Sequence, residues 1–99
     1  MKINRISVLG QEVKIEYVDL GVSSNYGEYH DDCSTILIDK NLSEDIMMQT
    51  LLHEIVHVVC ARLGISGQSE FPALVEEVLA ETFSKAIIQN FRLLPMKKS

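Results

Sequence analysis

The residues best suited to chemistry lie in TLLHEIVHVVCARLG, residues 50–64. His53 and His57 are four residues apart, and on a helix this spacing places both imidazoles on one face, one turn apart. Two nitrogens at that separation can bind one Zn²⁺ ion at about 2.0–2.1 Å. Glu54 lies about 100° further round, where its carboxylate can reach water at the metal without ligating it. The H-E-x-x-H pattern therefore predicts two metal ligands and one general base on a single helix.

The alternative is a buried helix whose histidines are merely hydrogen-bonded core residues. The rest of the segment is strongly apolar, so its polar side chains are expected to be buried. A buried polar group without a partner costs about 1–3 kcal/mol. A metal that engages both imidazoles removes this cost, and the pattern favours the zinc interpretation.

A zinc ion held by two histidines needs a third protein ligand, with the fourth position left for water. Cys60 lies three residues beyond His57, but a thiolate there would favour a closed structural site. His30 is the remaining histidine of the chain. The following helical segment offers three carboxylates, Glu76, Glu77 and Glu81. Helical periodicity alone does not choose among these candidates.

The elements that must position these residues begin with strands, because apolar and polar residues alternate in the N-terminal third. Segments 4–10 and 11–20 predict a hairpin with a turn at Gly10-Gln11. A short strand is expected over GEYH, residues 27–30. STILID, residues 34–39, is the clearest strand and is expected at the sheet edge beside the cleft, where an extended substrate would add as a further strand.

Two helices are predicted after the strands. Ser43 is a suitable N-cap for the first helix and Gly64 suits its C′ position. This helix is apolar nearly all round, so burial on most sides is expected. Pro72 suits the first turn of the second helix. Apolar residues recur there at helical spacing and mark it as a core helix: Leu74, Val75, Val78, Leu79, Phe83, Ala86 and Ile87.

Strands followed by helices predict an α+β fold, with a small N-terminal antiparallel sheet of about three strands followed by two core helices. The 99 residues suit a single domain over 1–99. The net charge of −5 and the lack of a basic stripe argue against direct binding of nucleic acid. The sequence has no membrane-spanning apolar run, no signal peptide and no disulfide framework, so a cytoplasmic protein is expected.

The segment TLLHEIVHVV, preceded by a strand ending in ILID and followed by EEVLAETF, resembles the small phage and prophage zinc metallopeptidases related to the ImmA/IrrE family. The resemblance implies a minimal zincin-like fold of the gluzincin type. In that type the third ligand is a glutamate of an E-x-x-A-like motif on the next helix. Of the three carboxylates on the following helix, only Glu77 begins such a motif, Glu77-Val78-Leu79-Ala80, so the resemblance selects Glu77 over Glu76 and Glu81. The A-N-x-F-A continuation common after the glutamate reads AETFSK here.

The resemblance implies a zinc-dependent endopeptidase that cleaves an extended protein segment, with a phage or prophage repressor as the substrate by analogy. Glu54 would act as general base and one Zn²⁺ ion as the cofactor. Three residues are candidates for stabilising the oxyanion or contacting substrate: Tyr26, Tyr29 and His30. The alternative is a non-catalytic, zinc-stabilised module that binds a protein partner. The sequence leaves the substrate and the oligomeric state open.

Overall fold

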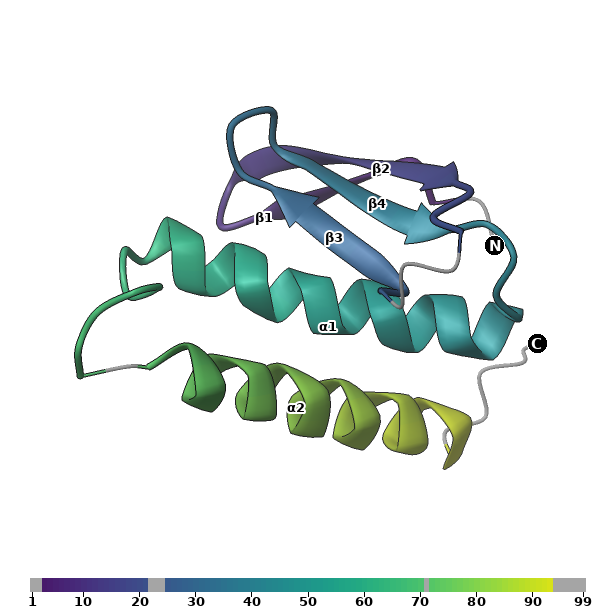
Figure 1. Cartoon of the computed structure of the whole chain (residues 1–99). Helices are drawn as coiled ribbons and strands as arrows, with labels where there is room; N and C mark the ends of the chain where they lie inside the picture. Colours follow the sequence, from purple (N-terminus) through teal and green to yellow (C-terminus); the bar gives the residue numbers. More distant parts are fainter. Residues whose placement is uncertain (1–2, 22–24, 71, 94–99) are drawn as a thin grey trace.

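The computed structural model describes residues 3–21, 25–70 and 72–93. Four strands precede two helices along the chain (Figure 1). Their bounds are β1 (Arg5–Val8), β2 (Gln11–Val18), β3 (Gly27–His30), β4 (Thr35–Asp39), α1 (Glu44–Arg62) and α2 (Ala73–Leu93). The predicted α+β class is confirmed, with one strand more than expected.

The sheet is mixed rather than antiparallel, with strand order β1-β2-β4-β3. β1 and β2 form the predicted hairpin, and β3 and β4 form a second antiparallel pair, but β2 and β4 run parallel. The expectation that residues 34–39 form the sheet edge is wrong, because β4 lies between β2 and β3. Ile36 and Ile38 of β4 are fully buried, as suits a strand with neighbours on both sides. The sheet edges are β1 and β3, and β3 is the edge strand beside the cleft.

The first hairpin closes through Leu9-Gly10 rather than Gly10-Gln11, because Val8 pairs directly with Gln11. Both turn residues have positive φ, 52° at Leu9 and 81° at Gly10. Such a two-residue turn matches the right-handed twist of the flanking strands. Glycine adopts this conformation at no steric cost, and here it occupies the second central position.

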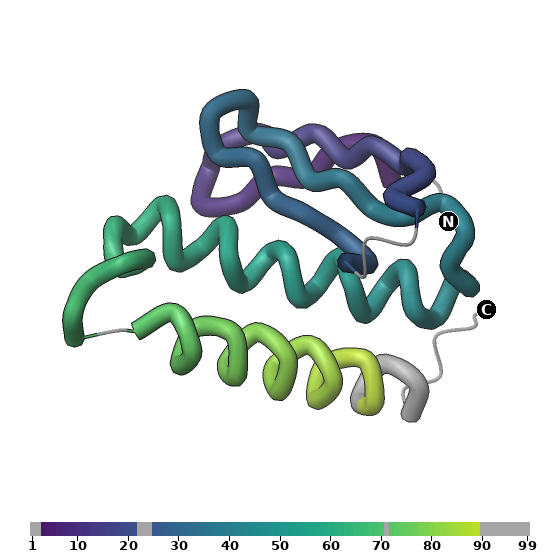
Figure 2. The backbone as a smooth tube through the Cα atoms, viewed as in Figure 1, coloured from purple at the N-terminus to yellow at the C-terminus, as the bar shows by residue number. Residues whose placement is uncertain are grey.

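α1 is the middle of three layers, with the sheet on one side and α2 on the other (Figures 1 and 2). Leu51 and Val58 pack in the main core against buried strand residues. Val56 and Cys60 pack in a smaller core against Ala80 of α2. Apolar contacts on two opposite sides account for the lack of a single apolar stripe on α1, and the expected burial on most sides is confirmed.

The ends of α1 follow the predicted capping. The Ser43 side chain accepts a hydrogen bond from the Ile46 N–H at 3.4 Å, and Gly64 follows the helix with φ of 74°. α2 begins directly after Pro72. None of the helices in the described ranges is long and apolar enough to cross a membrane.

The interpretation of α2 as a helix buried through its apolar stripe is wrong. Its buried residues are Glu76, Ala80 and Ser84, whereas Leu79 and Phe83 are exposed. α2 therefore turns polar and small side chains toward α1 and its larger apolar side chains away. The physical reason lies in the site between the two helices.

Candidate metal centre

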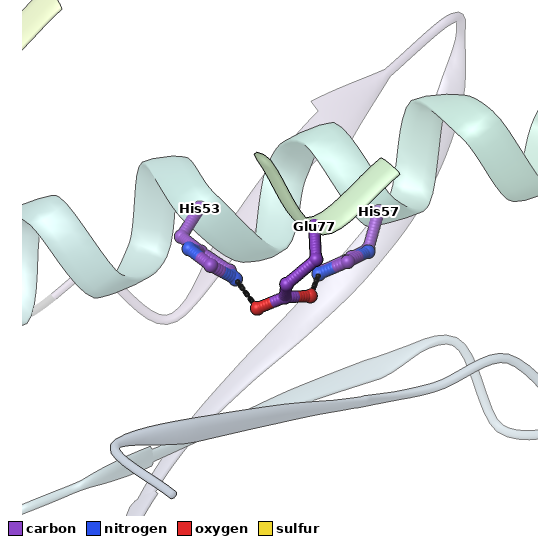
Figure 3. Close-up of side chains that lie close together, drawn as sticks. All are labelled: His53, His57 and Glu77. Atoms are coloured by element: carbon purple, nitrogen blue, oxygen red, sulfur yellow. Dashed lines mark ion pairs between the residues drawn. The ribbon is translucent and has the colours of Figure 1, made fainter. Parts of the chain in front are cut away.

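Three side chains from two helices converge on one point (Figure 3). His53 and His57 project from the same face of α1, and Glu77 of α2 places its carboxylate between them. Nε2 of His53 lies 3.0 Å from Glu77 Oε2, and Nε2 of His57 lies 3.0 Å from Glu77 Oε1. One ligand atom from each residue lies within 4.8 Å of the others, which is the one such group among the described residues.

This spacing fits a single zinc ion. Ligand atoms about 2.0–2.1 Å from a tetrahedral centre are about 3.3 Å apart, close to the observed nitrogen–oxygen distances. Two imidazoles and one carboxylate form the ligand set of several catalytic zinc sites, where the fourth position stays open. The two faces that carry the ligands belong to α1 and α2, so a bound ion would join these helices.

The other nitrogen of each imidazole faces a second carboxylate of α2. Nδ1 of His53 lies 3.0 Å from Glu81 Oε1, and Nδ1 of His57 lies 2.5 Å from Glu76 Oε2. An ionised carboxylate only accepts hydrogen bonds, so with a metal on Nε2 each ring would carry its proton on Nδ1 and donate it to this second carboxylate. In that tautomer each Nε2 would offer its lone pair to the metal, and the contact at Nδ1 would orient the ring.

The two accepting carboxylates are themselves held in place. Ser66 donates a hydrogen bond from its Oγ to Glu76 Oε1 at 2.9 Å, and Glu76 is only 9% exposed. Lys85 Nζ lies 3.2 Å from Glu81 Oε2. Sequence reasoning retained Glu76 and Glu81 as alternative ligands, but in the structure both contact Nδ1 atoms instead.

The remaining ligand candidates lie away from this point. Cys60 is buried against Val56 and Ala80 in the smaller core. His30 places Nε2 3.0 Å from Glu28 Oε1 on the edge strand and does not line the cleft beside the histidines. Neither belongs to the group of converging ligand atoms.

Glu54 lies beside this group with its side chain buried and unpaired. The residue is 7% exposed, and its carboxylate makes no hydrogen bond or ion pair within the part of the chain that the structure describes. Burial raises the pKa of Glu54; the nearby histidines oppose this and Glu77 adds to it. A buried carboxylate without a protein partner is costly unless it serves a bound group or water.

Four carboxylates surround two imidazoles, so the protein part of the site is strongly negative. The pKa of His57 shows this balance. Burial lowers that pKa, but the hydrogen bond to Glu76 and the charges of Glu54 and Glu77 outweigh burial, and the net shift is upward. A site that favours positive charge on His57 in this way also favours a bound divalent cation.

A cleft of about 830 Å³ opens over this site between β3, α1 and α2. Tyr26 and Tyr29 both line the cleft. Tyr26 is exposed at 56%, whereas Tyr29 donates a hydrogen bond from its hydroxyl to Asp31 at 2.6 Å. Of the three residues expected to contact substrate, two therefore line the cleft and His30 does not.

Gly27 lets the edge strand approach α1 closely, a feature that sequence reasoning missed. A Cβ at position 27 would lie 2.7 Å from Thr50 Cγ2 and 3.0 Å from the Leu37 carbonyl oxygen. It would also lie 3.4 Å from Cγ of Glu54. The absence of a side chain at this position keeps β3 beside the histidine helix and next to Glu54.

Comparison with protein families adds an independent observation. The model of a peptidase family, Peptidase_M78, described as the IrrE N-terminal-like domain, matches residues 10–88. Comparisons with curated proteins and with solved structures give no significant match. The matched region extends from the first hairpin turn into α2 and includes His53, Glu54, His57 and Glu77. The chain therefore belongs to the IrrE N-terminal-like family of ImmA/IrrE-like peptidases.

Proposed function

We propose that this protein is a zinc-dependent endopeptidase that cleaves an extended segment of another protein. The observation that carries the proposal is the convergence of His53, His57 and Glu77 beside a buried and unpaired Glu54 in an open cleft. A site that merely stored a structural metal would not require an unpaired carboxylate next to it. Membership of a peptidase family supports a protein or peptide substrate.

Zinc would be held by His53, His57 and Glu77, and it would supply Lewis acidity that polarises a peptide carbonyl and activates water. Glu54 accepts the proton of the attacking water at its carboxylate and passes that proton to the leaving amine. Burial raises the pKa of Glu54 above that of an ordinary carboxyl group, a direction that suits a group that both accepts and returns a proton.

The substrate segment is proposed to pair with the edge strand β3 rather than with β4. β3 pairs with β4 on one side and with no described strand on the other, and its residues Gly27 to Tyr29 line the cleft. An extended peptide added there gains backbone hydrogen bonds and crosses the cleft beside Glu54. Tyr26 is the phenol we assign to the oxyanion, because the Tyr29 hydroxyl already binds Asp31.

The cellular setting is part of the same proposal. Cys33 and Cys60 are both free thiols, one exposed and one buried. Free exposed thiols suit a reducing compartment, which agrees with action in the cytoplasm. A phage or prophage repressor cut in an extended segment is the substrate class that we propose.

The first experiment combines zinc content with Glu54→Gln. Purified wild-type protein is expected to bind one zinc ion per chain by elemental analysis and to cut members of a random peptide library, detected as new amino termini by mass spectrometry. Glu54→Gln is expected to keep the zinc and to lose cleavage, whereas Glu70→Gln, at an exposed position outside the cleft lining, is expected to keep both.

Persistent cleavage by Glu54→Gln would refute the role given to that carboxylate. Wild-type protein that binds zinc but cuts no peptide in the library would contradict the endopeptidase proposal. That outcome would favour the zinc-stabilised binding module instead. Wild-type protein that binds no zinc would contradict both functions.

A further inference from the structure

Two buried polar residues lack a partner among the residues that the structure describes. Six polar or charged residues are buried within those ranges. Four of the six have hydrogen-bond partners within the protein, namely Thr35, Asp39, Glu76 and Ser84. The other two are Thr50 and Glu54, and neither makes a hydrogen bond or ion pair with any described residue. The proposed function uses Glu54 but gives no role to Thr50.

The free hydroxyl of Thr50 is unusual for a position within a helix. Ser and Thr side chains in helices commonly donate to the carbonyl three or four residues before them. Ser84 of α2 does so, with its Oγ 3.0 Å from the carbonyl oxygen of Glu81. Thr50 of α1 makes no such bond within the described chain, although only 7% of the residue is exposed. A buried hydroxyl without a partner is destabilising, and a group that binds there would remove that cost.

Thr50 and Glu54 occupy the same part of the cleft. They are four residues apart on α1, so both side chains lie on one face of the helix, about one turn apart. Both line the cleft. Both also lie next to Gly27 of β3, because a Cβ there would be 2.7 Å from Thr50 Cγ2 and 3.4 Å from Glu54 Cγ. The two unpartnered groups therefore face the space in which a substrate would react.

We propose that the Thr50 hydroxyl forms a hydrogen bond with the backbone of the substrate segment, on the His53 side of the bond that is cut. This contact rests on the proposed endopeptidase function, to which it adds a residue that holds the substrate. Thr50 precedes His53 along α1, so the contact falls on that side of the metal ligands. The cleft continues there to Gln49 and Ile46, which gives the segment room to extend.

The chemistry of a hydroxyl favours the peptide backbone as its partner. A hydroxyl both donates and accepts, so it can pair with a peptide carbonyl or with a peptide N–H. The Cγ2 methyl is the branch of Thr50 that faces Gly27, which leaves the hydroxyl branch for an added segment. A strand added to β3 would lie about 4.7–4.9 Å from it, and β3 lies beside α1 (Figure 1). The backbone of that strand is thereby brought near residue 50.

Thermal unfolding tests whether the hydroxyl lacks a partner, and it needs no substrate. Thr50→Val keeps the branched shape and the methyl group but removes the hydroxyl. Because the loss of an unpartnered buried polar group is stabilising, the zinc-bound variant is expected to melt at a higher temperature than wild type. Thr82→Val is the matched control, since Thr82 is exposed on α2 outside the cleft lining. If Thr50→Val melts no higher than Thr82→Val, the hydroxyl is already satisfied in the free protein and the proposal is overturned.

Steady-state kinetics tests the contact itself, with the peptide of the random library that wild-type protein cuts fastest. A hydrogen bond present in both the bound substrate and the transition state lowers KM without changing kcat. Thr50→Val is therefore expected to raise KM about 3- to 10-fold at constant kcat. Thr50→Ser, which keeps the hydroxyl, is expected to bring KM back toward the wild-type value. Thr82→Val is expected to change neither constant, and zinc content shows that each variant retains the metal site.

Failure of this contact is distinguishable from failure of the proposed function. Wild-type protein that binds zinc but cuts no peptide contradicts the proposed function, and the contact of Thr50 with it. Wild-type protein that cuts the peptide, with an unchanged KM in Thr50→Val, overturns the contact alone. A fall in kcat at constant KM, with a shift in the pH dependence of kcat, would also overturn it, because the hydroxyl would then act on Glu54 rather than on the substrate.

Discussion

A single stretch of α2, from Glu76 to Glu81, contacts all the imidazole nitrogens of the site. Glu77 faces both Nε2 atoms, Glu76 faces Nδ1 of His57, and Glu81 faces Nδ1 of His53. The two outer carboxylates are not equivalent. The Glu76 side chain is 11% exposed and Glu81 is 47% exposed, so solvent screens Glu81 more strongly.

Loss of the Glu76 carboxylate is therefore expected to weaken zinc binding more than loss of Glu81. Glu76→Ala leaves the Nδ1–H of His57 without its acceptor in a half-buried site, and a decrease in zinc affinity of about 10–100-fold is expected. Glu81→Ala is expected to cause a smaller decrease, because water can replace its exposed carboxylate. Competition with a chromophoric chelator measures both affinities without reference to catalysis.

Glu76→Gln separates the hydrogen bond from the charge. A glutamine at this position can accept from His57 Nδ1 through its oxygen and donate to Ser66 through its nitrogen. If the zinc affinity of Glu76→Gln stays close to that of wild type, the hydrogen bond that orients the His57 ring, rather than the charge of Glu76, accounts for the loss in Glu76→Ala. Unchanged affinity in Glu76→Ala would show that His57 needs no acceptor here.

At the scale of elements, the approach of β3 to α1 depends on one missing side chain. Gly27→Ala places a methyl group 2.7 Å from Thr50 Cγ2 and 3.0 Å from a backbone oxygen of β4. The backbone cannot move away as a flexible side chain can, so a loss of about 1–3 kcal/mol in the free energy of unfolding is expected. Chemical denaturation with urea measures this loss.

Thr50→Ser provides the matched control for that substitution. It removes the methyl group nearest to position 27 and keeps the hydroxyl. The double variant is expected to recover part of the stability lost in Gly27→Ala, because the contact with Thr50 Cγ2 is relieved. Recovery is incomplete because the contact with the β4 oxygen remains. Strictly additive effects of the two substitutions would show that residues 27 and 50 do not contact one another.

The features that sequence reasoning predicted well are local ones. The histidine helix was predictable because Ser43, Gly64 and the H-E-x-x-H spacing all lie within one continuous segment. The strand order was not predictable, because the parallel pairing of β2 with β4 joins segments separated by the whole of β3. Alternation of apolar residues identifies a strand but not its neighbours.

The orientation of α2 was wrongly predicted for a physical reason. The rule that the apolar side of a helix faces the core assumes that nothing stronger holds the polar side there. In α2, Glu76, Glu77 and Glu81 face the histidines of α1, so the apolar side is turned outward. Glu77 was selected by family pattern, since periodicity alone cannot distinguish a ligand from a charged surface residue.

At the scale of the whole molecule, the two helices are held by unequal cores. The core between the sheet and α1 contains seven buried apolar residues, whereas the core between α1 and α2 contains Val56, Cys60 and Ala80. α2 therefore gains little stability from apolar burial within one chain. Much of the remaining stabilisation of α2 against α1 comes from the contacts of its carboxylates with His53 and His57.

Metal removal is accordingly expected to loosen α2 before the rest of the fold. Binding to the folded state at a free zinc concentration 100 times Kd stabilises that state by about 2.7 kcal/mol, and this stabilisation acts where the ligands join α1 to α2. Hydrogen exchange after chelation should accelerate in residues 73–93 while β4 keeps its protection. Glu77→Ala with zinc present should reproduce the chelated pattern. Equal acceleration in β4 and α2 would show instead that the two cores unfold as one unit.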